Sequence, residues 1–388
     1  MNNNKKIYIF LAIVAYQCIG ANIAHPVTPT LITDLGLPDY SFGLFFAGMA
    51  FTNFLFSPMW ARLVDKFGSK IILGVCCTGY SLSQVMFACF TTVQTIMFAR
   101  LSAGFFVGGI MVSYLTHTVY LSEMLTRGRN LAYLATTSTV FSTFGYFVGG
   151  MLGEISISAA FIGQVFVLFT SGILFYIFVE PDGDLEMTFD WKRDANPFLA
   201  FYLPKQFRTK AFIMIFICVF LSSMGTTGYD QTFNYYIKDV YDFSTAYNGI
   251  IKAVIGIISF IFNMTICLWL FRKTDIKKSV IWVLLGCGLS IMMSVFVSSV
   301  PLFIICILIF FGFNALYIPL LQDLSVKEDN GTTLAGMYNA MKSLGMITGA
   351  LYAGFVYEVN EKLPFIIAGV LFFISVGVMM QYVREKRS

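Results

Sequence analysis

Residues 301–323 read PLFIICILIFFGFNALYIPLLQD, and the first charged residue of this stretch is its last, Asp323. About 20 consecutive apolar residues are enough for an α-helix to cross a hydrocarbon core of about 30 Å. Comparable runs recur along all 388 residues, of which 57% are hydrophobic and only 12% are charged. An ordinary soluble domain has about 25% charged residues. The sequence therefore excludes a soluble protein and predicts a polytopic membrane protein.

The apolar runs are typical of helices rather than of barrel strands. Strands of a membrane barrel alternate in polarity over segments of about ten residues, and this sequence has no such alternation. Runs that are broken by charged or turn-forming residues predict an all-α protein with twelve membrane-spanning helices. The predicted spans are residues 7–31, 40–61, 71–91, 95–119, 130–152, 158–179, 211–236, 244–268, 279–299, 301–323, 332–356 and 363–383.

The positions of the basic residues predict the orientation of the chain. With the N-terminus in the cytoplasm, the loops on that side hold 20 of the 25 Lys and Arg, and the outer loops hold only Lys238 and Lys362. The remaining three lie within spans. Cytoplasmic loops of membrane proteins are enriched in Lys and Arg. We therefore expect both termini on the cytoplasmic side of a bacterial-type inner or plasma membrane.

One long polar connection, between the sixth and seventh spans, divides the chain. We expect an N-terminal six-helix bundle over residues 1–180, a cytoplasmic central loop over 181–210 and a C-terminal six-helix bundle over 211–388. Two pseudo-symmetric six-helix bundles that move against each other around a midplane site are typical of secondary transporters.

Glycines support this division. The fifth and eleventh spans carry a pair of glycines at the same four-residue spacing, namely Gly145 and Gly149, and Gly345 and Gly349. Small residues four apart let two helices approach closely, which in lipid supplies packing that hydrophobicity cannot. We expect these four residues to be helix-packing positions at equivalent places in the two bundles.

The loop after the second predicted span reads ARLVDKFGSK over residues 61–70. Basic side chains and one carboxylate at the ends of two helices can form a charge network that latches one conformation. The alternative is that the basic residues only anchor the loop on the cytoplasmic side. The predicted gating residues are Arg62, Asp65, Lys66, Gly68 and Lys70.

Three motifs carry a resemblance to a known family. Residues 61–70 resemble the signature G-x-L-x-D-R-x-G-R-K of the major facilitator superfamily, with Ala and Ser in place of the first Gly and one Arg. Residues 100–104, RLSAG, resemble its R-x-x-x-G motif. Residues 145–150, GYFVGG, resemble the G-P-x-x-G-G motif of its drug-exporting branch, with Tyr146 in place of the proline. The whole chain is thus similar to bacterial twelve-span drug:proton antiporters.

The resemblance implies the twelve-helix superfamily fold and alternating access between its two halves. It implies a secondary active exporter that moves an amphipathic, drug-like small molecule out of the cell in exchange for protons. Three alternatives use the same parts: an exporter of an anionic or zwitterionic metabolite or metal chelate, an organic-anion uptake symporter, and a lipid flippase.

Four ionisable residues lie within predicted spans, at Arg100, Asp230, Lys252 and Lys342. A charge near the bilayer centre costs roughly 2.5–3.5 kcal/mol, so each one requires a partner or a water-filled cavity. Asp230 is the one carboxylate away from the predicted loop ends, and we expect it to carry the coupled proton. The alternatives for Asp230 are a static ion pair with Lys252 or Lys342 and exposure at the outer end of its span.

Three cations against one carboxylate leave a positive surplus, which favours an acidic or zwitterionic substrate. The first span adds polar side chains beside two prolines that interrupt its hydrogen bonds, and the seventh and tenth spans add aromatic and amide side chains. The predicted substrate-binding residues are Arg100, Lys252, Lys342, Asn22, His25, Tyr229, Phe233, Asn314 and Tyr317.

The sequence also predicts that catalytic, nucleotide-binding and metal sites are absent. It contains no nucleophile–base constellation and no P-loop, so we expect neither an enzyme nor an ATPase. The eight cysteines lie in apolar runs without a CxxC pair, and the two histidines are predicted at different depths, so we expect no metal site and no cofactor. The expected partners are a small-molecule substrate, protons and membrane lipids, without nucleic acid, and the expected state is a monomer.

Overall fold

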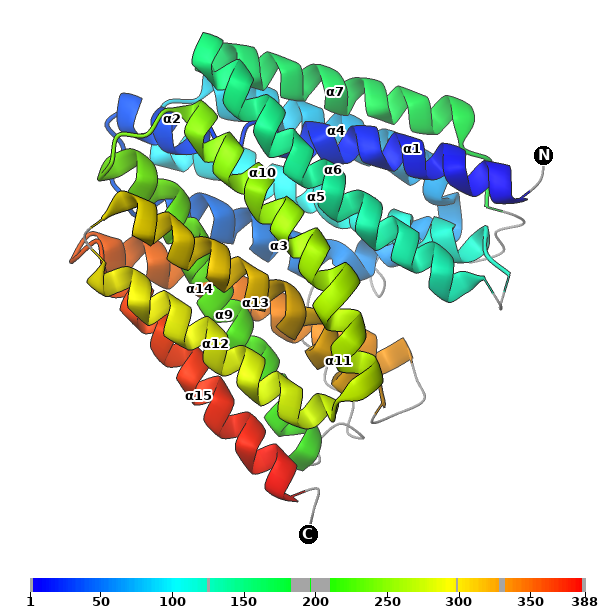
Figure 1. Ribbon diagram of the computed structural model, residues 1–388. Helices are drawn as coiled ribbons and strands as arrows, with labels where there is room; N and C mark the ends of the chain where they lie inside the picture. The colour runs from blue at the N-terminus through cyan, green and yellow to red at the C-terminus, as the bar shows by residue number, and fades with distance from the viewer. Residues whose placement is uncertain are drawn as a thin grey trace. The chain divides into compact units, whose positions relative to one another are not determined.

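The structure is a computed structural model that describes residues 3–123, 126–182, 196, 210–297, 299–327 and 332–385. Every regular element in these residues is a helix (Figure 1). In chain order the helices are α1 (Asn3–Asn22), α2 (Thr28–Asp34), α3 (Ser41–Phe67), α4 (Ser69–Cys89), α5 (Val93–Tyr120), α6 (Arg127–Ile155), α7 (Ile157–Phe178), α9 (Lys210–Asp239), α10 (Thr245–Phe262), the π-helical turn η3 (Asn263–Cys267), α11 (Leu268–Lys273), α12 (Ile276–Phe296), α13 (Val300–Lys327), α14 (Thr332–Tyr357) and α15 (Leu363–Glu385).

These elements account for the twelve predicted spans. The first span is divided into α1 and α2, because Pro26 lies between them and Pro29 occupies the second position of α2. Proline has no N–H to donate to a helical hydrogen bond and is best tolerated in the first turn, so two prolines three residues apart favour a break here. The eighth span continues from α10 through η3 into α11. Each of the other ten spans is one α-helix, so the predicted all-α fold is confirmed.

Hydropathy separates the long helices of the described residues into two groups. Nine segments are long and apolar enough to cross a membrane by length and composition, with α10, η3 and α11 taken as one segment. Helices α1, α6 and α14 are also at least 20 residues long but are less apolar. A helix that borders a polar cavity needs an apolar surface only where it meets lipid.

The chain folds into two compact units that interleave along the sequence. The first unit consists of Met1–Leu37, Gly48–Ala200 and Lys238–Ala253, and the second of Pro38–Ala47, Phe201–Ile237 and Val254–Ser388. The start of α3 thus packs in the second unit, and the start of α10 packs in the first. The simple division at residues 181–210 stays a prediction.

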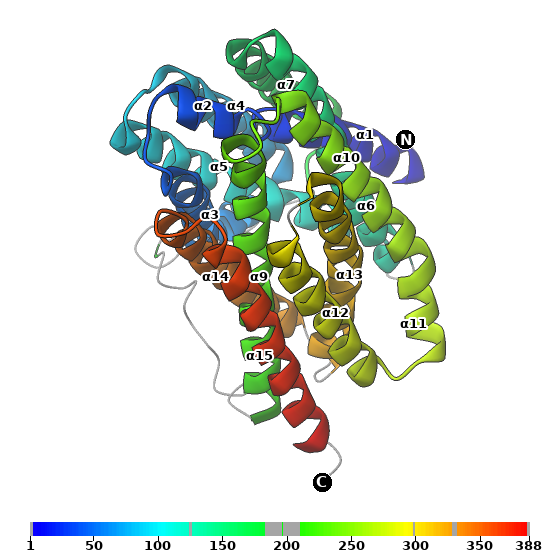
Figure 2. The ribbon, with the colours of Figure 1, turned by 60° about the vertical axis from the view of Figure 1, so that its left-hand side comes forward.

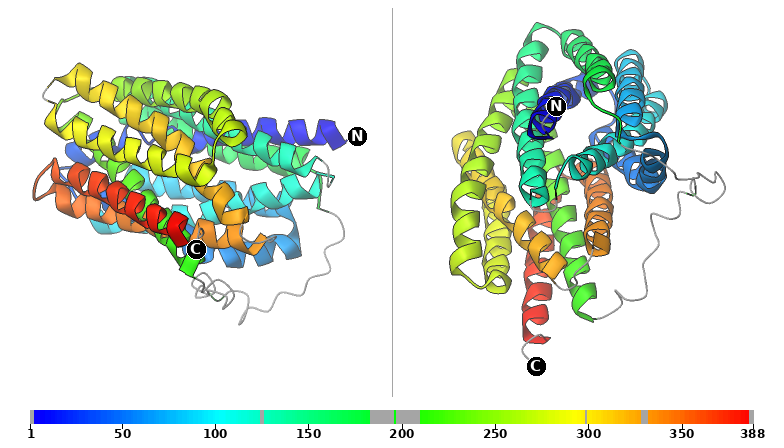
Figure 3. Two further views of the ribbon diagram at one scale, coloured as in Figure 1. Left: turned by 60° about the horizontal axis from the view of Figure 1, so that its bottom comes forward. Right: turned by 90° about the vertical axis from the view of Figure 1, so that its right-hand side faces the viewer.

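The two units repeat one pattern of helix neighbours. In the first unit α4 packs against α5 and α7 (Figure 1), and in the second α12 packs against α13 and α15 (Figure 2). Helix α1 packs against α6 and α7, and the right of Figure 3 shows α1 nearly end-on. The repeated neighbours around α4 and α12 are those expected of internal structural repeats.

Paired glycines allow a close helix contact in each unit. In the first unit the glycines of α6 face carbonyl oxygens of α1 and of the residue that follows it, and in the second the glycines of α14 face carbonyl oxygens of α9. The four contacts are Gly145 with Ile19, Gly149 with Ile23, Gly345 with Phe220 and Gly349 with Met224. A Cβ added at any of the four glycines would overlap the facing oxygen, so only glycine allows this approach.

Candidate functional site

Arg100 of α5 is a cation buried in the first unit, with 6% of its surface exposed. Its Cζ lies 4.0 Å from the ring centroid of Phe87 on α4, and its Nη1 lies 3.8 Å from the sulfur of Met49. Its Nε has no hydrogen-bond partner among the described residues. Ring and sulfur contacts stabilise a buried guanidinium only in part. Arg100 therefore retains a donor for an anionic group.

Tyr146 of α6 brings two predicted site residues together. Its ring is stacked on that of His25, with 5.3 Å between centroids and 16° between planes. The Nζ of Lys252, on α10, lies 5.5 Å from the centroid of the Tyr146 ring. Lys252 is 7% exposed, and the face of an aromatic ring stabilises an ammonium that is removed from water. The first unit thus holds an aromatic and cationic group of three side chains.

Asn22 borders this group at the end of α1. Its Nδ2 donates to the carbonyl of Cys18 at 2.8 Å. A Cβ added at Gly145 would lie 3.0 Å from the Asn22 Cβ, so Asn22 lies against the residue that precedes Tyr146. The structure therefore places three of the predicted binding residues, Asn22, His25 and Lys252, around one stretch of α6.

In the second unit a hydroxyl joins two predicted site residues of α13. The hydroxyl of Thr226, on α9, donates to the Oδ1 of Asn314 at 3.1 Å and lies 2.7 Å from the hydroxyl of Tyr317. The Tyr317 hydroxyl also lies 3.5 Å from the carbonyl of Ser222. Thr226, Asn314 and Tyr317 therefore form one polar group between α9 and α13.

Tyr229 and Phe233 of α9 are enclosed by aromatic side chains and are 0% exposed. The ring centroid of Tyr229 lies 4.4 Å from that of Phe310 and 5.3 Å from that of Phe365. The centroids of Phe233 and Phe311 are 6.5 Å apart. Pairs at these separations belong to aromatic packing. The structure thus places these two predicted substrate contacts in the core of the second unit.

Asp230 and Lys342 are both half-buried in the second unit. Asp230 lies four residues after Thr226 on α9, and residues four apart share one face of a helix. In the described part of the chain, no hydrogen bond or ion pair holds the ammonium of Lys342, on α14. The alternative of a static pair between Asp230 and Lys252 or Lys342 stays a prediction.

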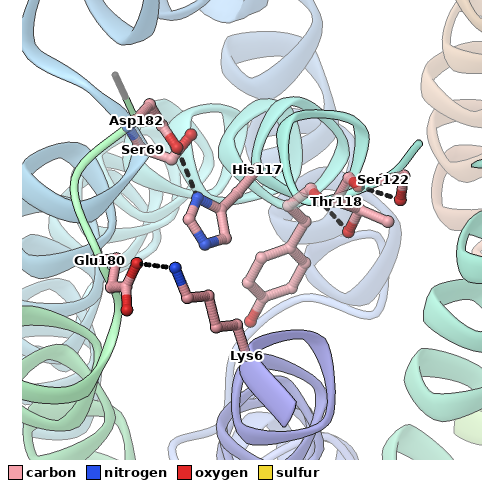
Figure 4. Close-up of polar contacts among 8 residues, drawn as sticks. Lys6, Ser69, His117, Thr118, Ser122, Glu180 and Asp182 are labelled. Carbon is pink, nitrogen blue, oxygen red and sulfur yellow. Dashed lines mark hydrogen bonds and ion pairs between the residues drawn. The ribbon is translucent and has the colours of Figure 1, made fainter. Parts of the chain in front are cut away.

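A buried polar cluster lies at the ends of α4 and α5, beside the residues that follow α7 (Figure 4). Asp182 accepts a hydrogen bond from Nδ1 of His117 on α5 at 2.5 Å and another from the backbone N–H of Ser69, the first residue of α4. The side chains of His117 and Asp182 are 1% and 7% exposed. Nearby, the ammonium of Lys6 on α1 lies 2.5 Å from the carboxylate of Glu180.

The two carboxylates of this cluster are held in the charged form. Burial acts to raise the pKa of Asp182, but the hydrogen bonds from His117 and Ser69 outweigh it and hold the pKa below the usual 3.8. The hydrogen bond from Lys6 lowers the pKa of Glu180. Asp182 also lies at the N-terminus of α4, where the helix dipole favours a negative charge. The cluster therefore ties the segment after α7 to α1, α4 and α5.

The predicted gating residues lie beside this cluster. Gly68 precedes α4 with φ of 82°, a left-handed conformation that favours glycine. Lys66 and Lys70 lie over aromatic rings, at 5.2 Å from the Phe67 centroid and 5.3 Å from that of Tyr176. Within the described ranges, no hydrogen bond or ion pair joins Arg62 to Asp65. The carboxylate that binds the α4 N-terminus is Asp182 rather than Asp65.

The sequence predictions missed four residues of these groups: Tyr146, Thr226, His117 and Asp182. Tyr146 had a signal, because it departs from the proline of the drug-exporter motif. Asp182 and His117 are 65 residues apart, and nothing in the hydropathy pattern indicates that they meet.

Comparisons with known proteins identify the family of the chain. Residues 9–335 match the family model described as "Major Facilitator Superfamily". The chain is 23% identical over 385 residues to multidrug resistance protein 1 of Bacillus subtilis, covering 98% of this chain and 96% of that protein. It is 22% identical over 370 residues to the quinolone resistance protein NorA of Staphylococcus aureus, covering 94% and 93%.

A solved structure shows the same fold. A bacterial homolog of the human lysosomal transporter Spinster superposes with a TM-score of 0.78 over 99% of this chain and 97% of that one, at 12% identity. The helical fold, the paired glycines in both units and the family match over residues 9–335 all indicate the same family. The chain is a multi-pass membrane transport protein, not an enzyme, and it belongs to the major facilitator superfamily.

Proposed function

We propose that the chain is a secondary active exporter that moves an amphipathic, drug-like small molecule out of the cell by alternating access, in exchange for protons. The observation that carries this proposal is the similarity to a multidrug resistance protein and a quinolone resistance protein over more than nine tenths of each chain. The protein works as a monomer in the bacterial plasma membrane, with both termini in the cytoplasm.

The side chains divide the work between the two units. Arg100, Lys252 and the ring of Tyr146 bind the substrate in the first unit. In the second unit Asp230 carries the proton, on the same face of α9 as Thr226, which bonds to Asn314. The packing of Gly145 on α1 and of Gly349 on α9 supports rigid helix pairs that move as units during alternating access.

A second candidate function is favoured by the buried charges. Arg100 has an unpartnered Nε, and no partner holds Lys342 in the described residues. A buried cation without a counter-charge is costly and is stabilised when an anion binds. These two residues favour a substrate with a carboxylate or another acidic group, which is the exporter of an anionic or zwitterionic metabolite or metal chelate.

The test is substrate-induced proton movement in proteoliposomes. Tetraphenylphosphonium serves as the lipophilic cation and anilinonaphthalene sulfonate as the amphipathic anion, with wild type beside Asp230→Asn and Asp34→Asn. We expect wild type and Asp34→Asn to move protons with substrate and Asp230→Asn not to do so. A response to the anion alone establishes the second candidate. No proton movement with either probe refutes proton-coupled export of both classes.

A further inference from the structure

A groove of about 950 Å³ is lined by side chains of α2, α4 and α7 of the first unit. These three helices are labelled in Figure 1. Its walls are apolar and outward-facing: Leu82, Ile162 and Phe166 are between 61% and 69% exposed. In a membrane protein such a surface meets hydrocarbon rather than water. The volume is within the range of small-molecule sites, about 300–1,000 Å³.

The groove has the depth of one lipid leaflet. On α4 it extends from Thr78 to Cys89, and on α7 from Ile157 to Phe169. At 1.5 Å per residue these stretches are about 16 and 18 Å long, against about 15 Å for half of the hydrocarbon core. Cys89 and Ile157 end and begin their helices on the side that the Lys and Arg distribution predicts to be outside. The groove therefore follows the outer leaflet.

The two hydroxyls in the deep part of the groove, those of Thr78 and Ser81, already donate hydrogen bonds within the protein. The hydroxyl of Ser81 donates to the carbonyl of Val165 at 3.0 Å, and that of Thr78 donates to the carbonyl of Gly74 at 2.8 Å. The deep part therefore offers no unpaired hydroxyl to a polar ligand. An unbranched apolar chain fits this part, because such a chain has no donor or acceptor that needs a hydrogen bond.

The outer end of the groove carries one charge. Asp34, the last residue of α2, is exposed there, and the lining contains no Lys, Arg or His. A carboxylate at the boundary between hydrocarbon and water binds an ammonium group and repels an anionic head group. The lining thus combines an apolar channel of leaflet length with a negative end.

We propose that this groove binds a phospholipid of the outer leaflet whose head group carries an amine. One acyl chain lies in the outward-facing groove along α4 and α7, and the ammonium pairs with Asp34. A phospholipid is favoured over a drug-like cation because the groove is open to the hydrocarbon along a full leaflet, and because its deep part makes no polar contact. The inference does not depend on the transported substrate.

The test is lipid retention measured by native mass spectrometry. The full chain is purified from vesicles of equal parts phosphatidylethanolamine and phosphatidylglycerol. We expect wild type to retain phosphatidylethanolamine about fivefold over phosphatidylglycerol, the factor that a partly exposed ion pair provides. Asp34→Asn removes the preference. The matched control is Glu358→Gln, which neutralises an exposed carboxylate of the second unit and leaves the preference unchanged.

Substitutions that fill the groove distinguish lipid binding at this site from non-specific contact of lipids with the membrane surface of the protein. Val85→Trp or Ile162→Trp places a large ring in the groove on an outward-facing side chain, so the core is not overpacked, and either variant loses the retained lipid. Equal retention of both lipids by wild type, or the same preference in Asp34→Asn, overturns the proposal. Displacement of the lipid by micromolar tetraphenylphosphonium also overturns it and assigns the groove to lipophilic cations.

Discussion

Replacing Asp182 should destabilise the first unit, because this carboxylate is buried and holds two hydrogen bonds. Asp182→Ala removes the bonds from His117 and from the Ser69 N–H and leaves both donors without a partner. Hydrogen bonds to a charged group contribute about 1.5–3 kcal/mol each, so we expect Asp182→Ala to lower the free energy of unfolding by about 4 kcal/mol. Asp182→Asn keeps one neutral acceptor of the same shape, so we expect this variant to lower the free energy of unfolding by about 2 kcal/mol.

The assay is thermal unfolding in detergent, followed with a thiol-reactive dye. Seven of the eight cysteines are buried and only Cys89 is exposed, so dye labelling reports unfolding. At about 2 °C per kcal/mol for a large chain, Asp182→Ala should lower Tm by about 8 °C and Asp182→Asn by about 4 °C. Glu180→Gln is the matched control in the same segment, and its exposed side chain predicts no measurable change.

The pH dependence follows from the depressed pKa of Asp182. A carboxylate whose pKa is lower in the folded than in the unfolded state stabilises the fold above the unfolded pKa, about 3.9. This stabilisation is lost as the pH falls through the folded pKa. The difference in Tm between wild type and Asp182→Asn should therefore be constant from pH 5 to 8 and close below about pH 4. A difference under 1 °C at pH 7, or one that grows on acidification, refutes the reasoning.

Three further predictions concern the helix contacts and the binding groups. Gly149→Ala should lower Tm, because the added methyl overlaps the Ile23 carbonyl and overpacking costs about 1–3 kcal/mol of unfolding free energy. Gly377→Ala has open space around it and should raise Tm, because the higher helix propensity of Ala adds about 1 kcal/mol to the unfolding free energy. Equal shifts of the same sign would contradict the packing. Tyr146→Phe should keep substrate affinity, because the ring alone contacts His25 and Lys252, whereas Tyr146→Leu should weaken binding about tenfold in a fluorescence titration; a stronger effect of the Phe variant would show that the hydroxyl matters instead. Arg100→Gln should reduce transport of an amphipathic anion more than that of a lipophilic cation, and an equal reduction of both in vesicle uptake assays would assign Arg100 to structure alone.

The polar groups of the two units differ in a way that bears on the substrate. The first unit contributes cations and an aromatic ring, at Arg100, Lys252 and Tyr146. The second contributes hydroxyl and amide groups and the half-buried carboxylate Asp230. The proposed binding of a molecule with an aromatic body and an acidic group rests on the groups of the first unit, and the proposed proton coupling rests on Asp230 of the second.

The sequence by itself determined the all-α fold, the positions of the membrane spans and the family. In lipid every backbone group must be bonded within its own helix, so each span is a local property of about 20 residues and is readable without knowledge of its neighbours. The break in the first span was readable for the same reason, since Pro26 and Pro29 act on their own turn of helix. The glycine pairs of α6 and α14 were visible because their spacing follows the helix period.

Only the tertiary structure decided which side chains meet. The pairing of Asp182 with His117 joins residues 65 positions apart, and Tyr146 contacts His25 and Lys252 on two other segments. Hydropathy depends on composition along one helix, whereas these contacts depend on how each helix is rotated and how far it is shifted against its neighbours. The same reason encloses Tyr229 and Phe233 in an aromatic core, although their residue types alone suggested a binding surface. The groove along α4 and α7 likewise depends on side chains of both helices and of α2, which no single span records.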